Sequence, residues 1–153
     1  MIPLNVKLIS KFLGIEVKGK GFNILIKKRT WPKGREFKTK AETTSIIFGE
    51  PISGDLDSSL LALDKKLLYK FLIRNVVPRK ENRGTVTIND AILMEKIISG
   101  EMVDLPRLML AHMQFCFSHD THALPYPNLI EKILKFFSYY PKDLLSRTRE
   151  LFC

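Results

Sequence analysis

Apolar residues recur at helical spacing along most of the chain, and prolines and glycines interrupt them at short intervals. The longest such pattern runs from Leu60 to Val76 and stops just before Pro78. Residues three or four apart share one face of a helix, and an apolar face has to be buried against another element. Because proline ends a helix, the interruptions separate the pattern into short segments. The sequence therefore predicts a mainly α, compact multi-helix domain.

Capping residues set the expected limits of these helices. Gly14 and Gly100 stand where a helix C-terminus is expected, and Pro106 suits a first turn. Either Asp55 or Asp57 can cap the helix that runs to Val76, and either Thr87 or Asn89 can open the next one. The expected helices are residues 5–13, 55–76, 87–100, 106–116, 126–137 and 143–151.

Residues 15–54 differ from the rest because glycines and prolines punctuate them throughout. Two short apolar runs lie between these breakers, Phe22–Ile26 and Ser45–Phe48. They could be brief strands or loop segments, and periodicity does not decide between the two. We expect 15–54 to be an irregular, basic insertion between the first and second helices.

The chain length of 153 residues fits one domain, with its core in 55–138 and a short terminal helix in 139–153. The two cysteines, Cys116 and Cys153, do not make a disulfide framework, which is typical of a reducing compartment. The N-terminus does not resemble a signal peptide, and no segment is apolar enough to span a bilayer. We expect an intracellular protein, cytoplasmic or nuclear.

The net charge of +9 is concentrated near the N-terminus, where residues 1–50 hold 11 Lys and Arg against 4 Asp and Glu. Cations neutralise phosphates, and exposed aromatic side chains can stack on unpaired bases. The alternative is a solvated lysine-rich loop whose aromatic residues are buried. If the segment 18–40 binds nucleic acid, the expected contacts are Lys27, Lys28, Arg29, Trp31, Lys33 and Arg35.

Histidines and a cysteine gather in the sequence at His112, Cys116, His119 and His122. Imidazole and thiolate are zinc ligands, and the spacing of four places His112 and Cys116 on one helix face. However, the spacing matches none of the usual paired zinc signatures, and the neighbouring residues are apolar. The sequence favours a structural histidine and a buried cysteine over a metal site, and no cofactor is expected.

Catalytic patterns are missing from the sequence. Lys18-Gly19-Lys20-Gly21 lacks the spacing of a phosphate-binding loop, and no Gly-x-Ser-x-Gly elbow is present. The acidic residues Asp55, Asp57 and Asp64 are explained by helix starts, while Asp104 and Asp120 stand isolated. We therefore expect no catalytic residues and a protein that is not an enzyme.

An ordered series of short motifs lies between Leu60 and Phe137. It comprises Pro78-Arg79, Val86-Thr87-Ile88-Asn89-Asp90, Leu93-Met94, Ile97-Ile98-Ser99-Gly100, His112-Met113, Leu124-Pro125-Tyr126, Leu129-Ile130 and Lys132-Ile133-Leu134. In order and spacing this series resembles the putative plant transposon protein domain, which occurs in plant retrotransposon-related reading frames. Leu8-Ile9 and Phe12-Leu13-Gly14-Ile15 resemble an earlier helix of that family. Pro127 and Glu131 depart from the pattern.

The resemblance implies no catalytic residues and no established molecular role. Our own hypothesis, drawn from amphipathic helices without catalytic groups, is that the domain acts through protein association or assembly. Its partners would be further copies of itself or other element-encoded proteins, and no small-molecule substrate is evident. Nucleic-acid binding through 18–40 is the alternative. The family usually carries a segment ahead of the first helix, so we expect a truncated copy.

Overall fold

The computed structural model describes residues 4–17, 30–80, 83–118 and 125–137. Within these ranges the chain is mainly helical, and the only β pairing is an isolated antiparallel bridge between Asp57 and Thr85. This confirms the mainly α fold class. The α-helices are α1 (Val6–Leu13), α2 (Lys40–Phe48), α3 (Leu63–Phe71), α4 (Ile88–Ile98), α5 (Leu105–Phe117) and α6 (Pro127–Phe136).

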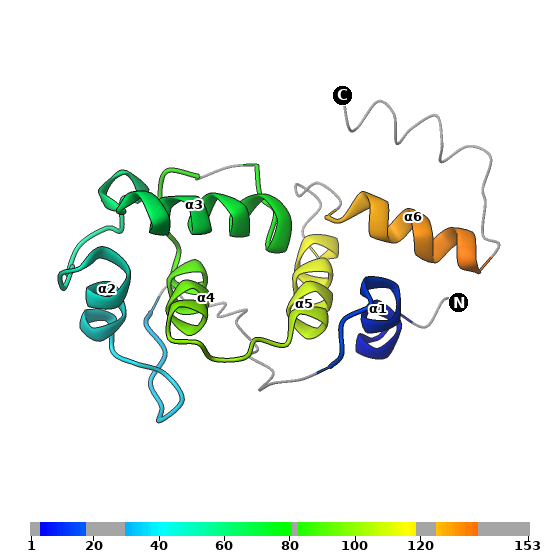
Figure 1. Cartoon of the computed structure of the whole chain (residues 1–153), viewed down its shortest axis with the longest axis horizontal. Coiled ribbons are helices and arrows are strands. Elements are labelled where there is room, and N and C mark those ends of the chain that lie inside the picture. The colour runs from blue at the N-terminus through cyan, green and yellow to red at the C-terminus, as the bar shows by residue number, and fades with distance from the viewer. Residues whose placement is uncertain (1–3, 18–29, 81–82, 119–124, 138–153) are drawn as a thin grey trace.

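The helices pack in two groups that lie side by side in Figure 1. In the first group α2 and α3 both contact α4, and in the second group α1 contacts both α5 and α6. The first helix of the chain therefore packs against the last two described helices. None of the helices in the described ranges has the length and apolar character that crossing a bilayer requires.

Each group has its own apolar core. The first core contains buried residues from α2, α3 and α4, and the second is centred on Ile9, Met113, Leu129 and Ile133. The buried members of the first core are Ile47, Leu56, Leu61, Tyr69, Leu72, Ile73, Val76, Val86, Ala91, Leu93, Met94 and Leu108.

Helix α5 joins the two cores, because Leu108 belongs to the first and Met113 to the second. Two polar contacts reinforce this connection near the end of the third helix. The Nε2 atom of His112 lies 3.0 Å from the carbonyl oxygen of Pro78, and the Tyr126 hydroxyl donates to the carbonyl of Val76. The turn before α6 is thus tied to the first group of helices.

Helix α1 agrees with the expectation for residues 5–13. The Asn5 side chain accepts a hydrogen bond of 2.9 Å from the Leu8 N–H, which caps the N-terminus. Gly14 ends the helix in the left-handed region, with φ of 66°, where a side chain would be strained.

Helix α2 corrects the expectation that Ser45–Phe48 could be a strand, since these residues form its last turn. Thr39 and Glu42 make a capping box at its start, and Gly49 ends it with φ of 83°. Ile47 places this helix in the first core. Phe22–Ile26, the other short apolar run, lies outside the described residues.

The expected helix from Asp55 or Asp57 to Val76 is divided into three parts. Asp57 caps a 3₁₀ turn at Ser58–Leu60, and α3 begins only at Leu63. After Phe71 the chain continues as a π-helical turn, Leu72–Val76, in which the Val77 N–H reaches back five residues to the Leu72 carbonyl at 2.8 Å. This wider turn ends just ahead of Pro78, as expected.

The later helix starts follow the capping residues. Thr87 opens α4 with a capping box to Asp90, and Pro106 occupies the first turn of α5. Asp104 caps α5, and its carboxylate accepts a hydrogen bond of 3.1 Å from the Arg107 N–H. Tyr126, with φ of 53°, precedes α6. The expected terminal helix in 139–153 lies outside the described residues.

Candidate interaction face of helix α3

Four large apolar residues around α3 face solvent and form what we call the apolar stripe: Leu60, Leu63, Leu67 and Phe71. Their exposed fractions lie between 57% for Phe71 and 74% for Leu63. Leu63, Leu67 and Phe71 are four residues apart, so they follow one another along one face of the helix. A single exposed leucine is ordinary, but a contiguous apolar surface marks an interaction site.

The opposite face of the same segment is buried in the first core. Tyr69, Leu72, Ile73 and Val76 are each no more than 9% exposed. The segment therefore carries two apolar faces, and only one of them has a partner within the described residues. The sequence pattern had placed both faces in one core-facing stripe.

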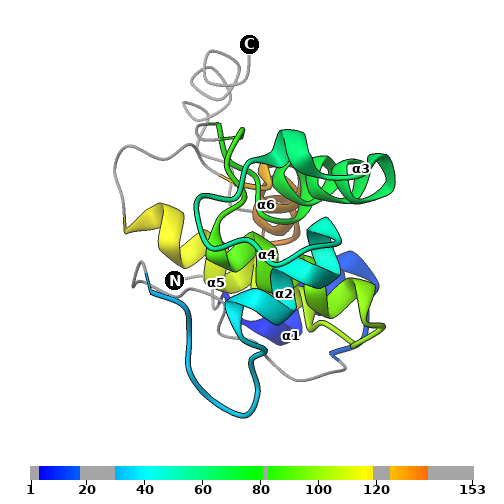
Figure 2. The ribbon, with the colours of Figure 1, turned by 90° about the vertical axis from the view of Figure 1, so that its left-hand side faces the viewer.

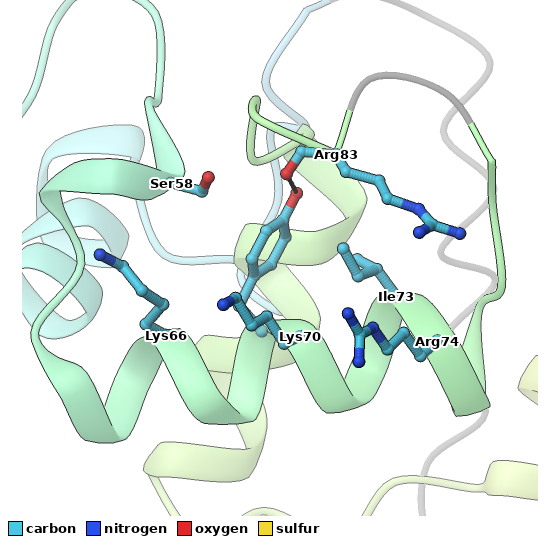
Figure 3. Close-up of a pocket in the computed structure, with 7 residues that line it drawn as sticks. Ser58, Lys66, Lys70, Ile73, Arg74 and Arg83 are labelled. Carbon is cyan, nitrogen blue, oxygen red and sulfur yellow. Dashed lines mark hydrogen bonds between the residues drawn. The ribbon is translucent and has the colours of Figure 1, made fainter.

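A row of cations runs beside the apolar stripe. Lys66, Lys70 and Arg74 are also four residues apart, and together with Arg83 they surround a pocket of about 240 Å³. Figure 3 shows the three cations rising from α3 and the π-helical turn, with Arg83 reaching across from the loop above. Ser58 and Tyr69 complete the polar lining. We call this the basic pocket.

The cations of the basic pocket make no ion pair with a carboxylate among the residues that the structure describes. The Lys66 ammonium donates to the Ser59 carbonyl at 3.2 Å, and Arg83 Nε donates to the Arg79 carbonyl at 2.9 Å. The nearby Asp57 carboxylate accepts from the Ser59 N–H, a bond that lowers its pKa. The pocket is therefore positively charged and open to an anion.

A buried polar network holds the loop of Arg83 in place. The Tyr69 hydroxyl lies 3.1 Å from the Arg83 carbonyl and 3.0 Å from the Thr85 carbonyl, and it accepts a bond of 2.7 Å from Arg79. Arg79 in turn pairs with Asp90 at 2.6 Å. Burial raises the pKa of Tyr69, so its hydroxyl remains a neutral donor. This network fixes one wall of the basic pocket to α3.

The expected nucleic-acid contacts are only partly within the described residues. Lys27, Lys28 and Arg29 lie outside them. Lys33 and Arg35 are exposed, whereas Trp31 packs partly buried against the first core. The Trp31 indole N–H donates to the Lys38 carbonyl at 2.9 Å. The described residues Trp31, Lys33 and Arg35 do not line the basic pocket.

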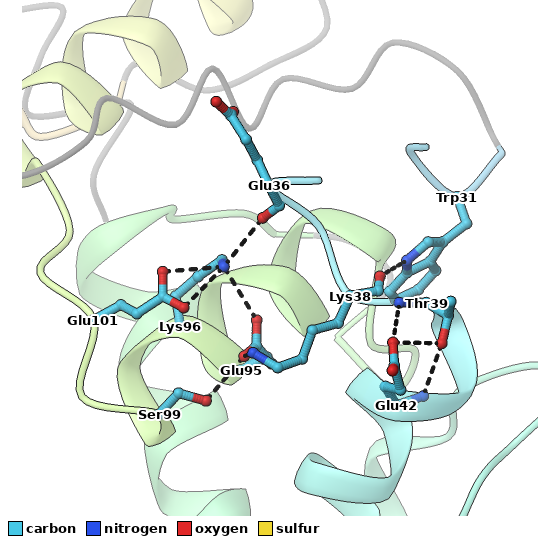
Figure 4. Close-up of polar contacts among 9 residues, drawn as sticks. All are labelled: Trp31, Glu36, Lys38, Thr39, Glu42, Glu95, Lys96, Ser99 and Glu101. Atoms are coloured by element: carbon cyan, nitrogen blue, oxygen red, sulfur yellow. Dashed lines mark hydrogen bonds and ion pairs between the residues drawn. The ribbon is translucent and has the colours of Figure 1, made fainter. Parts of the chain in front are cut away.

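The loop after Trp31 is fastened to the end of α4 by buried charges (Figure 4). The Lys38 ammonium lies 2.6 Å from Glu95, whose side chain is 2% exposed, and this bond raises the pKa of Lys38. Lys96 donates to the Glu36 carbonyl at 3.2 Å and pairs with Glu101 at 3.0 Å. The charges satisfy one another, so this cluster has a structural role.

His112 and Cys116 share one buried face of α5, with the thiol sulfur 3.6 Å from the His112 Nε2. That nitrogen already lies against the Pro78 carbonyl, which can only accept a hydrogen bond. Burial raises the pKa of Cys116, which disfavours the thiolate that zinc requires. His119 and His122 lie outside the described ranges, and within those ranges no three potential ligands cluster.

Comparison with known protein families shows which family the chain belongs to. Residues 1–138 match the model of the putative plant retrotransposon-related domain. The chain belongs to this family. The match confirms the resemblance drawn from the motifs between Leu60 and Phe137. No curated protein and no solved structure matches the chain.

Within this plant retrotransposon-related domain, the motif residues that suggested the family serve the fold. Arg79 and Asp90 form the buried ion pair behind the basic pocket, and Thr87 caps α4. His112 and Tyr126 join the two groups of helices. The motifs therefore build the scaffold, while the apolar stripe and the basic pocket lie on the exposed side of α3.

The sequence contained a signal for this face that the helical pattern alone concealed. Leu63, Leu67 and Phe71 repeat with a spacing of four, and Lys66, Lys70 and Arg74 repeat with the same spacing. Two parallel rows of this kind on one helix indicate an apolar strip bordered by cations. Which apolar face is buried depends on tertiary packing, and the sequence does not contain that information directly.

Proposed function

We propose that this retrotransposon-related domain is a protein-association module without catalytic function, and that the apolar stripe of α3 binds an acidic amphipathic helix of its partner. The observation that carries the proposal is the exposure of Leu63, Leu67 and Phe71 on one helix face. Helices commonly dock on such strips through apolar residues three and four positions apart. We propose that the partner is another protein encoded by the same element.

The composition of the stripe favours a protein over a nucleic acid. Three of its four members are leucine, and only Phe71 is aromatic. Unpaired bases bind by stacking on aromatic rings, which leucine side chains do not provide. Leucine is well suited to packing against other aliphatic side chains in a helix–helix contact.

The charge beside the stripe selects the occupant. Lys66, Lys70 and Arg74 border the stripe, so acidic residues on the flank of a docked helix would meet them. Two copies associating through this same face would instead bring two cationic rows together. We therefore propose a different, acidic chain as the partner.

A peptide pair tests this proposal on the full chain. One synthetic amphipathic peptide carries leucines at helical spacing with glutamates along one flank, and the other carries lysines in place of the glutamates. We expect the acidic peptide to bind, with affinity falling as salt rises, and the basic peptide to bind at least about tenfold more weakly. Fluorescence anisotropy measures both affinities.

The matched variants locate the binding face. Leu67→Gln with Phe71→Gln should weaken the acidic peptide at least about tenfold, because two exposed apolar anchors are lost. Met102→Gln with Phe117→Gln removes two equally exposed apolar side chains elsewhere and should leave the affinity unchanged. Equal binding of both peptides, or self-association in light scattering that depends on Leu67 and Phe71, would overturn the proposal.

A further inference from the structure

The basic pocket gathers several positive charges around one small site. Four cations from two separate segments line it, together with the Ser58 hydroxyl. One glutamate brings a single negative charge, whereas a phosphate monoester carries about −1.5 to −2 near neutral pH and offers three strong acceptor oxygens. The charge of the four cations therefore matches one phosphate group better than it matches one carboxylate.

The two arginines supply the kind of donor group that binds phosphate. A guanidinium presents its N–H groups as a rigid fork that fits two oxygens of one phosphate. Arg83 is oriented before binding, because its Nε donates to the Arg79 carbonyl at 2.9 Å and its own carbonyl lies 3.1 Å from the Tyr69 hydroxyl. Figure 3 places Arg74 and Arg83 on opposite sides of Ile73, at the same end of the pocket.

The size of the pocket limits what it can hold. Its volume of about 240 Å³ is below the range of roughly 300–1,000 Å³ that is typical of sites for whole small molecules. Tyr69, its aromatic lining residue, is only 1% exposed, so it offers no ring face for a base or a cofactor to stack on. The pocket therefore suits a charged group attached to something larger.

We propose that the basic pocket binds a phosphorylated side chain of the partner segment whose apolar residues dock on the adjacent stripe. This inference rests on the proposed association function and adds a phosphorylation dependence to it. Lys66, Lys70 and Arg74 lie along the stripe, so one segment can reach both surfaces. Phosphorylation of the partner would then strengthen its attachment to this domain.

Three versions of the acidic peptide test the inference on the full chain. They differ at one flanking position, which carries serine, phosphoserine or alanine. We expect the phosphoserine peptide to bind at least about tenfold more tightly than the other two, because each new charge-assisted hydrogen bond adds appreciably to affinity. Arg74→Gln with Arg83→Gln should abolish this gain, so that the serine and phosphoserine peptides bind within about twofold of each other. Both should bind more weakly than to the original chain, because Arg74 also borders the stripe.

The controls separate the two proposals. Lys33→Gln with Arg35→Gln removes two exposed cations away from α3 and should leave the phosphoserine gain intact. Loss of serine-peptide binding in the Leu67→Gln, Phe71→Gln variant tests the apolar stripe without involving the phosphate. Circular dichroism checks that each variant folds. Equal affinity for serine and phosphoserine, or a gain that survives removal of both arginines, would overturn the phosphate site.

Free anions and nucleic acid are the other occupants to be tested. Inorganic phosphate should compete with the phosphoserine peptide only weakly, because it lacks the apolar contacts. Single-stranded RNA is titrated against the full chain and the Arg74→Gln, Arg83→Gln variant. The proposal would be replaced by a nucleic-acid site if RNA bound more tightly than the phosphoserine peptide and if that binding were lost in the variant.

Discussion

At the scale of single residues, the ion pair between Arg79 and Asp90 stabilises the fold behind the basic pocket. The Asp90 side chain is 4% exposed, and it also accepts a bond of 3.0 Å from the Thr87 N–H. Asp90→Asn would leave the Arg79 guanidinium in a mostly buried site without its carboxylate. We expect the free energy of unfolding to fall by about 3 kcal/mol in urea denaturation.

The control for this change is Asp64→Asn, which removes an exposed carboxylate from α3. The Asp64 side chain is 70% exposed and pairs with its neighbour Lys65. Exposed pairs contribute little, so the expected change is within about 0.5 kcal/mol. If the two variants lost equal free energy of unfolding, burial would not explain the contribution of the Arg79–Asp90 pair to stability.

Individual residues also show what the sequence could and could not predict. The cap at Thr87 and the stop at Gly14 were predictable, because both depend on a few neighbouring residues. Leu63 and Leu72 have the same side chain, yet one is exposed and the other buried. Their difference arises because Leu72 packs in the first core, whose other members include residues of α2 and α4 that are distant in the sequence.

At the scale of elements, the capping box of α2 makes the stability of this helix sensitive to acid. Bonds from the Thr39 N–H and hydroxyl lower the pKa of Glu42 from its ordinary 4.5. The ionised form is therefore favoured by folding, and its contribution is complete above the ordinary pKa. As pH falls through the lowered pKa of the folded state, that contribution is lost.

Glu42→Gln tests this dependence. We expect the variant to lose less stability than the original chain between about pH 6 and about pH 3, because one carboxylate that folding favours has been removed. Urea denaturation at several pH values gives the comparison. Parallel profiles for the two proteins would contradict the assignment of the acid sensitivity to this cap.

Helix α2 was hidden in the sequence for a physical reason. Its buried positions include Thr43 and Thr44 as well as Ile47, so it has no continuous apolar stripe. Thr39, Glu42 and Gly49 nevertheless carry the signals of a helix start and stop. Caps identify such a short polar helix better than periodicity does.

At the scale of the whole molecule, α5 couples two cores that would otherwise be separate. Ile133→Ala removes buried apolar volume from the second core only, and it should cost about 2–5 kcal/mol. Trp31, the single tryptophan, packs against the first core. If the cores unfold together, its fluorescence and the circular dichroism signal should shift to the same lower denaturant midpoint.

Separate transitions would contradict this coupling. In that case the circular dichroism curve of the Ile133→Ala variant would show an early step that Trp31 fluorescence does not follow. A conservative control is Ile133→Val, for which the midpoint shift should be smaller, corresponding to about 0.5–1.5 kcal/mol.

The pairing of helices is the part of the fold that the sequence predicted least. The helical segments follow from local patterns, but α1 packs against α5 and α6 from the other end of the chain. The basic pocket likewise joins Arg83 to residues on α3 and the following turn. Such long-range contacts depend on the shape of whole packed surfaces. The spacing of residues along one segment does not determine them.

The contacts that follow α3 depend on the number of residues in the π-helical turn at Leu72–Val76. A turn that spans five residues per hydrogen bond contains one residue more than the α-helical equivalent. Removing one residue would rotate all that follows by about 100° around the axis of α3. Pro78 and Arg79 would then point away from His112 and Asp90. A deletion in this turn therefore displaces contacts that a conservative replacement of the same residue leaves in place.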